Sequence, residues 1–345
     1  MKTKSAHRSI RMLLTVWMAG WLSAFSLAAQ TAEGTGGACE AVYGIVNVSV
    51  ANLRSKPDFT SEMITQGLLG MPVRVLQQEG WYRVQLPDEY QGWVHRVGVC
   101  CVSRSQLEAW NKAEKIVVTA HYGSVYTKPS SKAQPVSDVV AGDRLKWEGS
   151  KGSFYRVSYP DGRMGYIEKR IARPEHRWRK ALRLDADAIL ATAHTLMGVP
   201  YLWAGTSSKG MDCSGLVRTV FFMHDVILPR DASQQAYVGQ HIDIAPDFSN
   251  LEPGDLIFFG RKPASDGQKP GISHVGIYIG HGRFIHSQGD VHISSLVATD
   301  DCFDAFNLGR LLFATRILPY INKDEKIMTT DRNPYYGTSL PAHRF

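Results

Sequence analysis

Two stretches of the chain alternate apolar and polar residues over short runs, which predicts two small all-β domains. The first stretch spans residues 40–100 and includes the run Trp81–Val84. The second spans residues 113–174 and repeats the order of the first, with Phe154–Val157 in the corresponding place. Glycine, proline, aspartate and serine separate the runs, so we expect each stretch to fold into a barrel of four or five short strands.

A third stretch, residues 185–320, has helix-like spacing first and strand-like runs afterwards. Apolar residues recur at helical spacing from Ile189 to Leu196, and a second helical pattern runs from Cys213 to about His224. Four apolar runs follow, and they predict strands at residues 255–259, 274–279, 283–287 and 310–317. Helices followed by antiparallel strands favour an α+β domain in which the helices pack on one sheet.

The first 29 residues have the pattern of a secretory signal peptide. Lysines and arginines precede an apolar run from Met12 to Leu27, and two alanines follow it. The small residues favour cleavage, and an uncleaved membrane anchor is the alternative interpretation. No later apolar run approaches the length of a membrane span, so we expect an exported protein, periplasmic or secreted, without a stable membrane span.

Two further segments lack a clear helical or strand period. Residues 172–184 are basic and irregular, and we interpret them as a solvated linker between the second barrel and the third domain. The polar, proline-containing residues 321–345 are expected to form a C-terminal tail that covers the surface or is partly disordered.

The overall charge adds little to this picture. The 345 residues carry a formal charge of +7, and 44% of them are hydrophobic. Four basic residues and no acidic residues lie in the signal segment, so its removal lowers the formal charge by four. Because no basic run is interleaved with aromatic residues, we do not expect nucleic-acid binding.

The cysteines predict neither a metal site nor a defined set of disulfides. There are five of them, Cys39, Cys100, Cys101, Cys213 and Cys302. An odd count in an exported chain leaves at least one thiol unpaired or paired with another chain, and the sequence does not assign the rest. The adjacent Cys100 and Cys101 lack the C-x-x-C spacing of a zinc site, so we expect no metal.

Cys213 is a candidate nucleophile because of its place in the third stretch. It stands at the predicted start of a helix, where the preceding Asp212 would cap the first turn. The positive end of the helix dipole would stabilise a thiolate there and lower the pKa of the thiol. A thiolate that attacks an amide also needs a base, and that base needs a partner that fixes its tautomer.

Two histidines downstream could supply these groups. His274 opens one predicted strand and His286 lies in the next, across a turn at Gly280–Gly282. A tight hairpin would put both side chains on neighbouring strands, with His286 orienting His274 and His274 facing Cys213. The alternative is that each histidine is only a polar residue at a strand end.

Four motifs in the third stretch closely resemble those of NlpC-type papain-like cysteine peptidases of bacterial cell-wall metabolism. The motifs are Asp212–Val217, Leu251–Phe259, Ser273–Gly280 and Phe284–Ser287, and the resemblance covers residues 185–317. It implies an α+β papain-like fold with Cys213 as nucleophile, His274 as base and His286 as the orienting residue, and no cofactor. It also implies cleavage between D-glutamate, through its γ-carboxyl, and the diamino acid of a peptidoglycan stem peptide.

The two barrels resemble the SH3-like domains of bacterial cell-wall proteins. The first carries the order N-L-R-x-x-P, then G, W-Y-x-V and G-W-V, and the second copy has diverged from it. A signal, two SH3-like barrels and a peptidase domain together resemble γ-D-glutamyl-L-diamino acid endopeptidases of the dipeptidyl-peptidase VI type. Such enzymes act on stem peptides with a free N-terminal L-alanine and release L-Ala-γ-D-Glu during murein peptide recycling or degradation.

The same resemblance implies substrate-binding residues around Cys213. Tyr201 would line the site, and its hydroxyl could donate to the oxyanion alongside the backbone N–H of Cys213. Asp212 and Ser214 flank the nucleophile in this pattern.

Further residues would recognise the amino end of the substrate. Asp231 would hold the ammonium, and Ala232 stands where relatives often have serine, so it offers only backbone groups. Tyr90 and Glu62 of the first barrel would cap the N-terminal alanine. The alternatives are a loop residue at the solvent edge for Tyr90 and a plain exposed carboxylate for Glu62.

Three functions follow from these patterns. The first is the peptidase on free stem peptides, with a remodelling DL-endopeptidase on intact peptidoglycan as the runner-up. The second is a catalytically silent wall-binding protein, against which the intact Cys213, His274 and His286 argue. The third is an acyltransferase or amidase on the same scaffold, against which Asp231 and the two barrels argue. The sequence leaves open whether the diamino acid is lysine or diaminopimelate.

Overall fold

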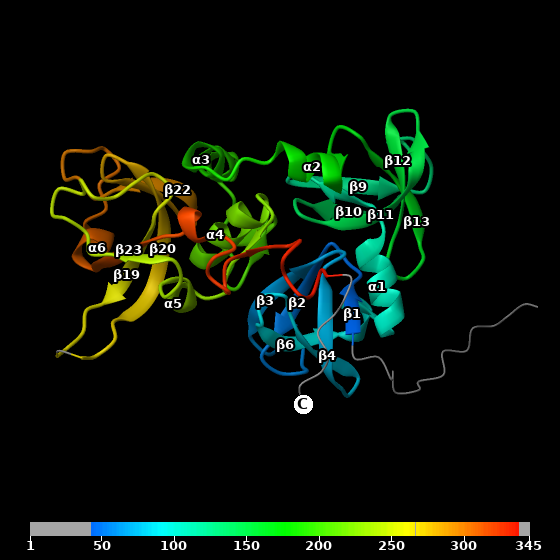
Figure 1. The fold of residues 1–345 in the computed structure, drawn as a ribbon, viewed down its shortest axis with the longest axis horizontal. Coiled ribbons are helices and arrows are strands. Elements are labelled where there is room, and N and C mark those ends of the chain that lie inside the picture. Colours follow the sequence, from blue (N-terminus) through cyan, green and yellow to red (C-terminus); the bar gives the residue numbers. More distant parts are fainter. Residues whose placement is uncertain (1–42, 266, 338–345) are drawn as a thin grey trace, which may run out of the picture. The chain divides into compact units, whose positions relative to one another are not determined.

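The computed structural model describes residues 43–265 and 267–337 (Figure 1). The predicted signal peptide, Cys39 and the last eight residues of the predicted tail lie outside this part. No helix of the described residues is both long and apolar enough to cross a membrane.

The first alternating stretch forms a seven-stranded antiparallel sheet around its own apolar core, coloured blue to cyan in Figure 1. Its strands are β1 Tyr43–Val46, β2 Val50–Arg54, β3 Met63–Leu68, β4 Pro72–Gln78, β5 Trp81–Gln85, β6 Gln91–His95 and β7 Val99–Val102. Their order in the sheet is β3-β2-β6-β5-β4-β1-β7, and a 3₁₀ turn at Arg96–Gly98 joins the last two in sequence. Buried residues such as Leu53, Val73 and Val84 alternate with more exposed ones, as the pattern predicted, but the sheet has seven strands where four or five were expected.

The second stretch repeats this sheet. Its strands are β8 Lys115–Val118, β9 Tyr122–Tyr126, β10 Pro135–Val140, β11 Arg144–Lys151, β12 Phe154–Ser158, β13 Met164–Glu168 and β14 Ala172–Pro174. Their order, β10-β9-β13-β12-β11-β8-β14, is that of the first sheet shifted by seven strands, so the predicted repeat is confirmed. Helix α1, Arg104–Lys112, connects the barrels and is capped by Ser103.

The predicted solvated linker is wrong for its first ten residues. Residues 172–174 form β14, and Glu175–Ala181 form helix α2. Trp178 is buried on the inner face of α2, while Arg179 pairs with Glu175 and Asp225. One basic residue, Arg179, therefore binds a carboxylate of the third domain, whereas Arg173, Arg177 and Lys180 are exposed as expected.

The third stretch has the predicted order of helices before strands. Helix α3, Ala186–Thr195, precedes α4, Cys213–Phe222, and the short helices α5, Ala232–Gln235, and α6, Ala305–Gly309, follow. The strands of the main sheet are β18 Gln240–Ile242, β19 Leu256–Arg261, β20 Gly271–Gly280, β21 Arg283–Gln288, β22 Asp290–Ser295 and β23 Leu311–Arg316. All neighbours are antiparallel, in the order β18-β23-β19-β20-β21-β22. The short strand pairs are β15 Thr206–Ser207 with β16 Gly210–Met211 and β17 Val226–Ile227 with β24 Met328–Thr329.

Helix α4 packs against this sheet through one apolar face (Figure 1). Leu216, Val217 and Val220 are fully buried and share a core with Val275 of β20 and Ile285 of β21. Burying side chains of this size stabilises the fold by roughly 1.5–3 kcal/mol each. The packing fixes the start of α4 against the first half of β20, which is where the candidate catalytic residues lie.

The chain after β23 does not simply cover the surface, as far as it is described. A 3₁₀ turn at Leu318–Tyr320 leads to β24, which pairs with β17, and Ile327 is fully buried. Asn333 is also buried and donates through Nδ2 to the carbonyl of Pro87 in the first barrel at 2.9 Å. The expectation of a surface tail is therefore wrong for residues 321–337.

Candidate active site

The start of α4 holds Cys213 at the predicted position. Asp212 is the N-cap, and its Oδ1 accepts from the backbone N–H of Gly215 at 2.7 Å, which confirms the predicted cap. The carbonyl oxygen of Gly205 lies against the Cα of Gly215 and leaves no room there for a side chain. Asp212 also accepts from the N–H of Ala204 at 3.0 Å, so the preceding turn and the helix are tied together.

The predicted lowering of the Cys213 pKa is wrong for the protein without substrate. Burial, with a further contribution from the charge of Asp212, raises the pKa of this thiol to about 11. The backbone N–H groups of Val275 and Ser214 act in the opposite direction but are outweighed. The thiolate therefore forms only when a neighbouring group takes the proton.

His274 is placed to take it. Val275, whose N–H reaches the thiol, directly follows His274 in β20, and the predicted hairpin is confirmed by the register Ile277↔Ile285. His274 Nε2 and His286 Nδ1 are 2.8 Å apart, which leaves Nδ1 of His274 for Cys213. Burial, followed by the positive charge of Arg310, lowers the pKa of His274 to about 3, so the imidazole is neutral and can accept a proton.

Ser294 extends this line, and sequence analysis missed it. His286 Nε2 is 3.0 Å from Ser294 Oγ, and both residues are buried. If His274 Nε2–H donates to His286, then His286 Nε2–H must donate to Ser294, because each neutral imidazole carries one N–H. Ser294 can accept this bond in the tautomer that leaves His274 Nδ1 free, and it lies in β22, a strand that the apolar pattern did not predict.

Asp212 and Ser214 are engaged by a buried arginine that was not predicted. Arg230 Nη2 lies 2.6 Å from Asp212 Oδ2, and Arg230 Nη1 donates to Ser214 Oγ at 2.8 Å. With the cap bonds, protein donors already fill both oxygens of Asp212. Arg230 precedes the predicted Asp231 in sequence, which is the signal that could have identified it.

Tyr201 lies beside the nucleophile. Its backbone forms an isolated parallel β-bridge with Met211, which lies two residues before Cys213, and Tyr201 is partly buried. Burial, followed by the charges of Cys213 and Asp212, raises the pKa of Tyr201 to about 12. Its hydroxyl therefore stays protonated at neutral pH and can act as a donor to developing negative charge.

The predicted residues of the first barrel meet the peptidase domain at the rim of this site. The Tyr90 hydroxyl donates to Asp231 Oδ1 at 3.4 Å, and Glu62 Oε1 accepts from Trp203 Nε1 at 2.9 Å. Asp231 is the N-cap of α5, and Ala232 is its first, buried residue. Trp203 is 61% exposed and was missed, although it stands two residues after Tyr201.

Two family models match parts of the chain. The NlpC/P60 family model matches residues 198–304, and the bacterial dipeptidyl-peptidase Sh3 domain model matches residues 53–97. The γ-D-glutamyl-L-lysine dipeptidyl-peptidase of Bacillus cereus is 30% identical over 236 residues, which are 66% of this chain and 68% of that protein. The chain belongs to the NlpC/P60 family.

Other NlpC/P60 proteins agree with this assignment over most of the chain. Dipeptidyl-peptidase 6 of Lysinibacillus sphaericus is 27% identical over 266 residues, which are 73% of this chain and 91% of that protein. A solved NlpC/P60 family protein from Bacillus cereus has a TM-score of 0.67 and 26% identity, and the match covers 80% of this chain and 100% of that one. The predicted α+β papain-like domain preceded by SH3-like barrels is thereby confirmed.

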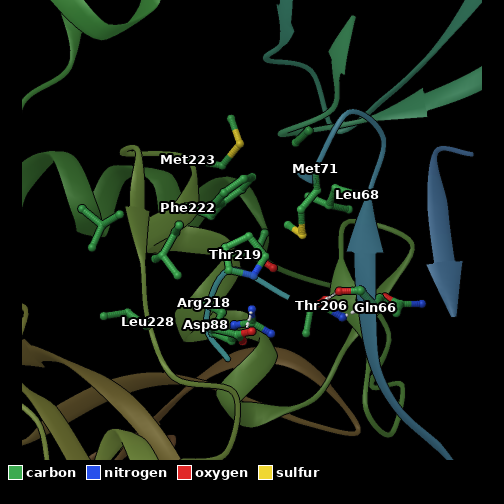
Figure 2. A pocket seen from close by; sticks show the side chains of 14 residues that line it. Gln66, Leu68, Met71, Asp88, Thr206, Arg218, Thr219, Phe222, Met223 and Leu228 are labelled. Carbon is green, nitrogen blue, oxygen red and sulfur yellow. Dashed lines mark hydrogen bonds and ion pairs between the residues drawn. The ribbon is translucent and has the colours of Figure 1, made fainter. Parts of the chain in front are cut away.

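In this NlpC/P60 chain a small cavity lies between the first barrel and α4. Figure 2 shows Arg218 and Asp88 pointing toward each other among its lining residues, and their charged groups are 2.6 Å apart. The cavity has a volume of about 30 Å³, room for a water molecule but not for a peptide. Asp88 also accepts from the backbone N–H of Tyr90 at 3.2 Å, so the ion pair holds the loop that carries Tyr90.

The described residues contain no group of three or more His, Cys, Asp or Glu side chains arranged to hold a metal ion.

Proposed function

We propose that this protein is a cysteine peptidase that acts on peptidoglycan stem peptides with a free N-terminal L-alanine. It hydrolyses the bond between γ-D-glutamate and the L-diamino acid and releases L-Ala-γ-D-Glu. The observation that carries the proposal is the contact of Tyr90 with Asp231, which joins the first barrel to the rim of a Cys–His–His site. Relatives named γ-D-glutamyl-L-lysine dipeptidyl-peptidases, at 30% and 26% identity, support the same substrate class.

The proposed reaction begins with a proton transfer. Cys213 gives its thiol proton to Nδ1 of His274, and the thiolate attacks the γ-carbonyl of D-glutamate. The negative charge on that oxygen is stabilised by the Tyr201 hydroxyl and the backbone N–H of Cys213. His274 then donates its proton to the leaving amine, and water, activated by the same imidazole, hydrolyses the thioester.

Charge and position give the proposed selectivity for a free amino end. The carboxylate of Asp231, held by Tyr90, attracts the ammonium of L-alanine, and Glu62 adds a second negative charge at the rim. A stem that is still amide-linked to glycan has no ammonium at this position and would leave these carboxylates without a partner. With the signal-like first 29 residues, this favours export and a role in degrading murein peptides outside the cytoplasm.

Two comparisons test the proposal. Cys213→Ala should abolish turnover of L-Ala-γ-D-Glu-diamino acid while the circular dichroism spectrum stays unchanged, and comparable turnover would refute the nucleophile. Acetylation of the substrate's N-terminus should lower kcat/KM at least ~30-fold, as expected for a charge-assisted contact of ~2 kcal/mol. Equal rates with and without the acetyl group, read by mass spectrometry, would favour a remodelling endopeptidase on intact peptidoglycan.

A further inference from the structure

Arg310 lies at the same end of the sheet as His274. Its carbonyl accepts from the N–H of Gly260 at 2.8 Å, at the end of β19 that pairs with the start of β20. In that register Phe259 is opposite both Leu311 and His274. The side chain of Arg310 crosses β19 and donates through Nη1 to the hydroxyl of Ser273 at 3.1 Å, and Ser273 directly precedes His274.

The hydrogen-bond partners found for Arg310 in the described residues are neutral. Nε donates to Asn307 Oδ1 at 3.0 Å, Nη1 contacts Ser273, and the guanidinium lies 4.6 Å from the ring centre of Phe306. By contrast, Arg230, Arg283 and Arg316 of the same domain each pair with an aspartate. Phe306 is 65% exposed, so the cation is supported by an aromatic wall that solvent or a ligand can reach.

The charge of Arg310 also reaches the reacting groups. After burial, it is the largest cause that lowers the pKa of His274. Burial also lowers the pKa of Arg310 itself, and the nearby charges of Asp304 and then Cys213 act in the opposite direction. A guanidinium is planar and suited to bidentate binding of a carboxylate. Two of its donors are held by Asn307 and Ser273, which orients the remaining N–H groups before any ligand binds.

The direction of the reaction indicates which ligand would lie here. The imidazole that activates the nucleophile later protonates the leaving amine, so the leaving diamino acid must sit beside His274. In a tripeptide this residue carries a free α-carboxylate, and diaminopimelate carries a second carboxylate on its side chain. Lysine would instead place an ammonium at the end of the side chain.

We propose that Arg310, oriented by Ser273 and Asn307 and backed by Phe306, binds a carboxylate of the leaving diamino acid. This subsite lies on the product side of the scissile bond, away from the Asp231 rim that holds the amino end. The inference depends on the proposed function, because it assigns the leaving group of that reaction. It makes a diamino acid with a free carboxylate a better substrate than the same residue blocked as an amide.

Four peptides test this inference with the full chain. All contain L-Ala-γ-D-Glu, and the leaving residue is L-lysine, L-lysine amide, diaminopimelate with its α-carboxyl amidated, or free diaminopimelate. Wild type should cleave the carboxylate-bearing peptides ~10- to 100-fold faster in kcat/KM than lysine amide. Two of the peptides have a single carboxylate on the leaving residue, the α-carboxylate in L-lysine and the side-chain carboxylate in α-amidated diaminopimelate. Comparing them shows which of the two carboxylates is bound.

Variants of Arg310 test whether this residue sets the ratio of kcat/KM between the carboxylate-bearing peptides and lysine amide. Arg310→Gln should bring the ratio of carboxylate to amide substrates close to one, and Arg310→Lys should retain part of the preference. Arg283→Gln, which breaks an ion pair with Asp300 at the far end of β21, is the matched control and should keep the wild-type ratio. A change in the pKa of His274 alters all four rates together and cancels in the ratio.

The outcomes separate this inference from the function on which it depends. If wild type cleaves none of the four peptides, the proposed function fails. If wild type cleaves lysine amide as fast as the carboxylate peptides, or Arg310→Gln slows all four equally, the function stands and the subsite is refuted. The wild-type comparison decides the point even if both Arg310 variants fold poorly.

Discussion

The two barrels share one strand order but differ in what the same loop contacts. The loop between β5 and β6 and the loop between β12 and β13 both contain Pro-Asp at matching positions, Pro87-Asp88 and Pro160-Asp161. Two residues later the first has Tyr90, which reaches Asp231 of the peptidase domain. The second has Arg163, which pairs with Asp161 and donates to the carbonyl of Asn47 in the first barrel.

The second barrel instead contributes buried ion pairs. Arg144 of β11 lies 2.9 Å from Glu175 of α2 and 3.1 Å from Asp225 behind α4, and its side chain is almost fully buried. None of these residues contacts the predicted rim of the site in the described structure. The two copies therefore share their strand pairing, while the first carries the residues that we propose to face the substrate and the second fastens the domains through buried ion pairs.

Arg144→Met should produce the largest effect on stability. It leaves Glu175 and Asp225 buried without their cation, which costs about 3–5 kcal/mol in the free energy of unfolding. Activity per folded molecule should stay unchanged, as measured by kcat/KM after titration of active sites. Arg170→Met, which removes an exposed pair with Glu168 in the same barrel, is the control and should leave the free energy of unfolding nearly unchanged. If Arg144→Met instead lowered kcat/KM for the free-amine peptide but not for the acetylated peptide, the second barrel would also take part in substrate recognition, contrary to this division of roles.

Asp231→Asn should have the next largest effect, on recognition. Asparagine also caps a helix, so α5 should survive, while the charge that attracts the ammonium is lost. We expect kcat/KM for the free-amine peptide to fall roughly 30- to 150-fold, which corresponds to a loss of about 2–3 kcal/mol of transition-state binding. The acetylated peptide should be affected much less, and an equal loss on both would mean that Asp231 acts on folding or catalysis.

A pH series on wild type and a His286 variant should report on the buried histidines of the candidate site. Burial lowers the pKa of His274 and of His286 to about 3, from an ordinary 6.5. The unfolded chain therefore binds protons below about pH 6.5 that the folded protein does not, so the free energy of unfolding falls as the pH drops from 6.5 toward 3. His286→Gln should weaken this slope by up to about 1.4 kcal/mol per pH unit and leave stability above pH 6.5 with the same pH dependence as wild type. Denaturant melts that keep the full slope would contradict a buried neutral His286.

Tyr90→Phe should have the smallest effect and is the sharpest comparison of the two loops. It removes only the hydroxyl that donates to Asp231, so kcat/KM for the free-amine peptide should fall about five-fold, by roughly 1 kcal/mol. Arg163→Gln, at the matching position of the second barrel, should not change kcat/KM. Equal effects of the two substitutions would show that the loops act through domain packing rather than through the rim.

Periodicity in the sequence predicted the parts of the fold whose residues contact near neighbours. The alternation gave both barrels, and the spacing around Cys213 gave α4 and its cap. Ser294 was missed because β22 was not predicted, although Asp290–Ser294 alternates polar and apolar residues as a half-buried strand does.

The pattern of apolar and polar residues could not predict contacts between residues far apart in the sequence. Trp203 meets Glu62 across 141 positions, and Asn333 meets Pro87 across 246. The prediction of a lowered pKa for Cys213 was wrong for a related reason. A helix start can be recognised in the sequence, but the burial that raises the pKa of the thiol depends on the assembled domain. The roles of Arg230 and Arg310 likewise depend on the partners that the fold brings to them, an aspartate for Arg230 and the neutral Asn307 and Ser273 for Arg310.

The bond from Asn333 to Pro87 has a consequence for biosynthesis. Pro87 opens the loop that carries Tyr90, yet its buried partner leaves the ribosome only after both barrels and the peptidase domain have been made. Before this segment is in place, the loop has its ion pair of Asp88 with Arg218 in α4, but the carbonyl of Pro87 lacks its partner. A frameshift or nonsense codon shortly before position 333 would therefore yield a protein with its catalytic residues in place and its selectivity relaxed.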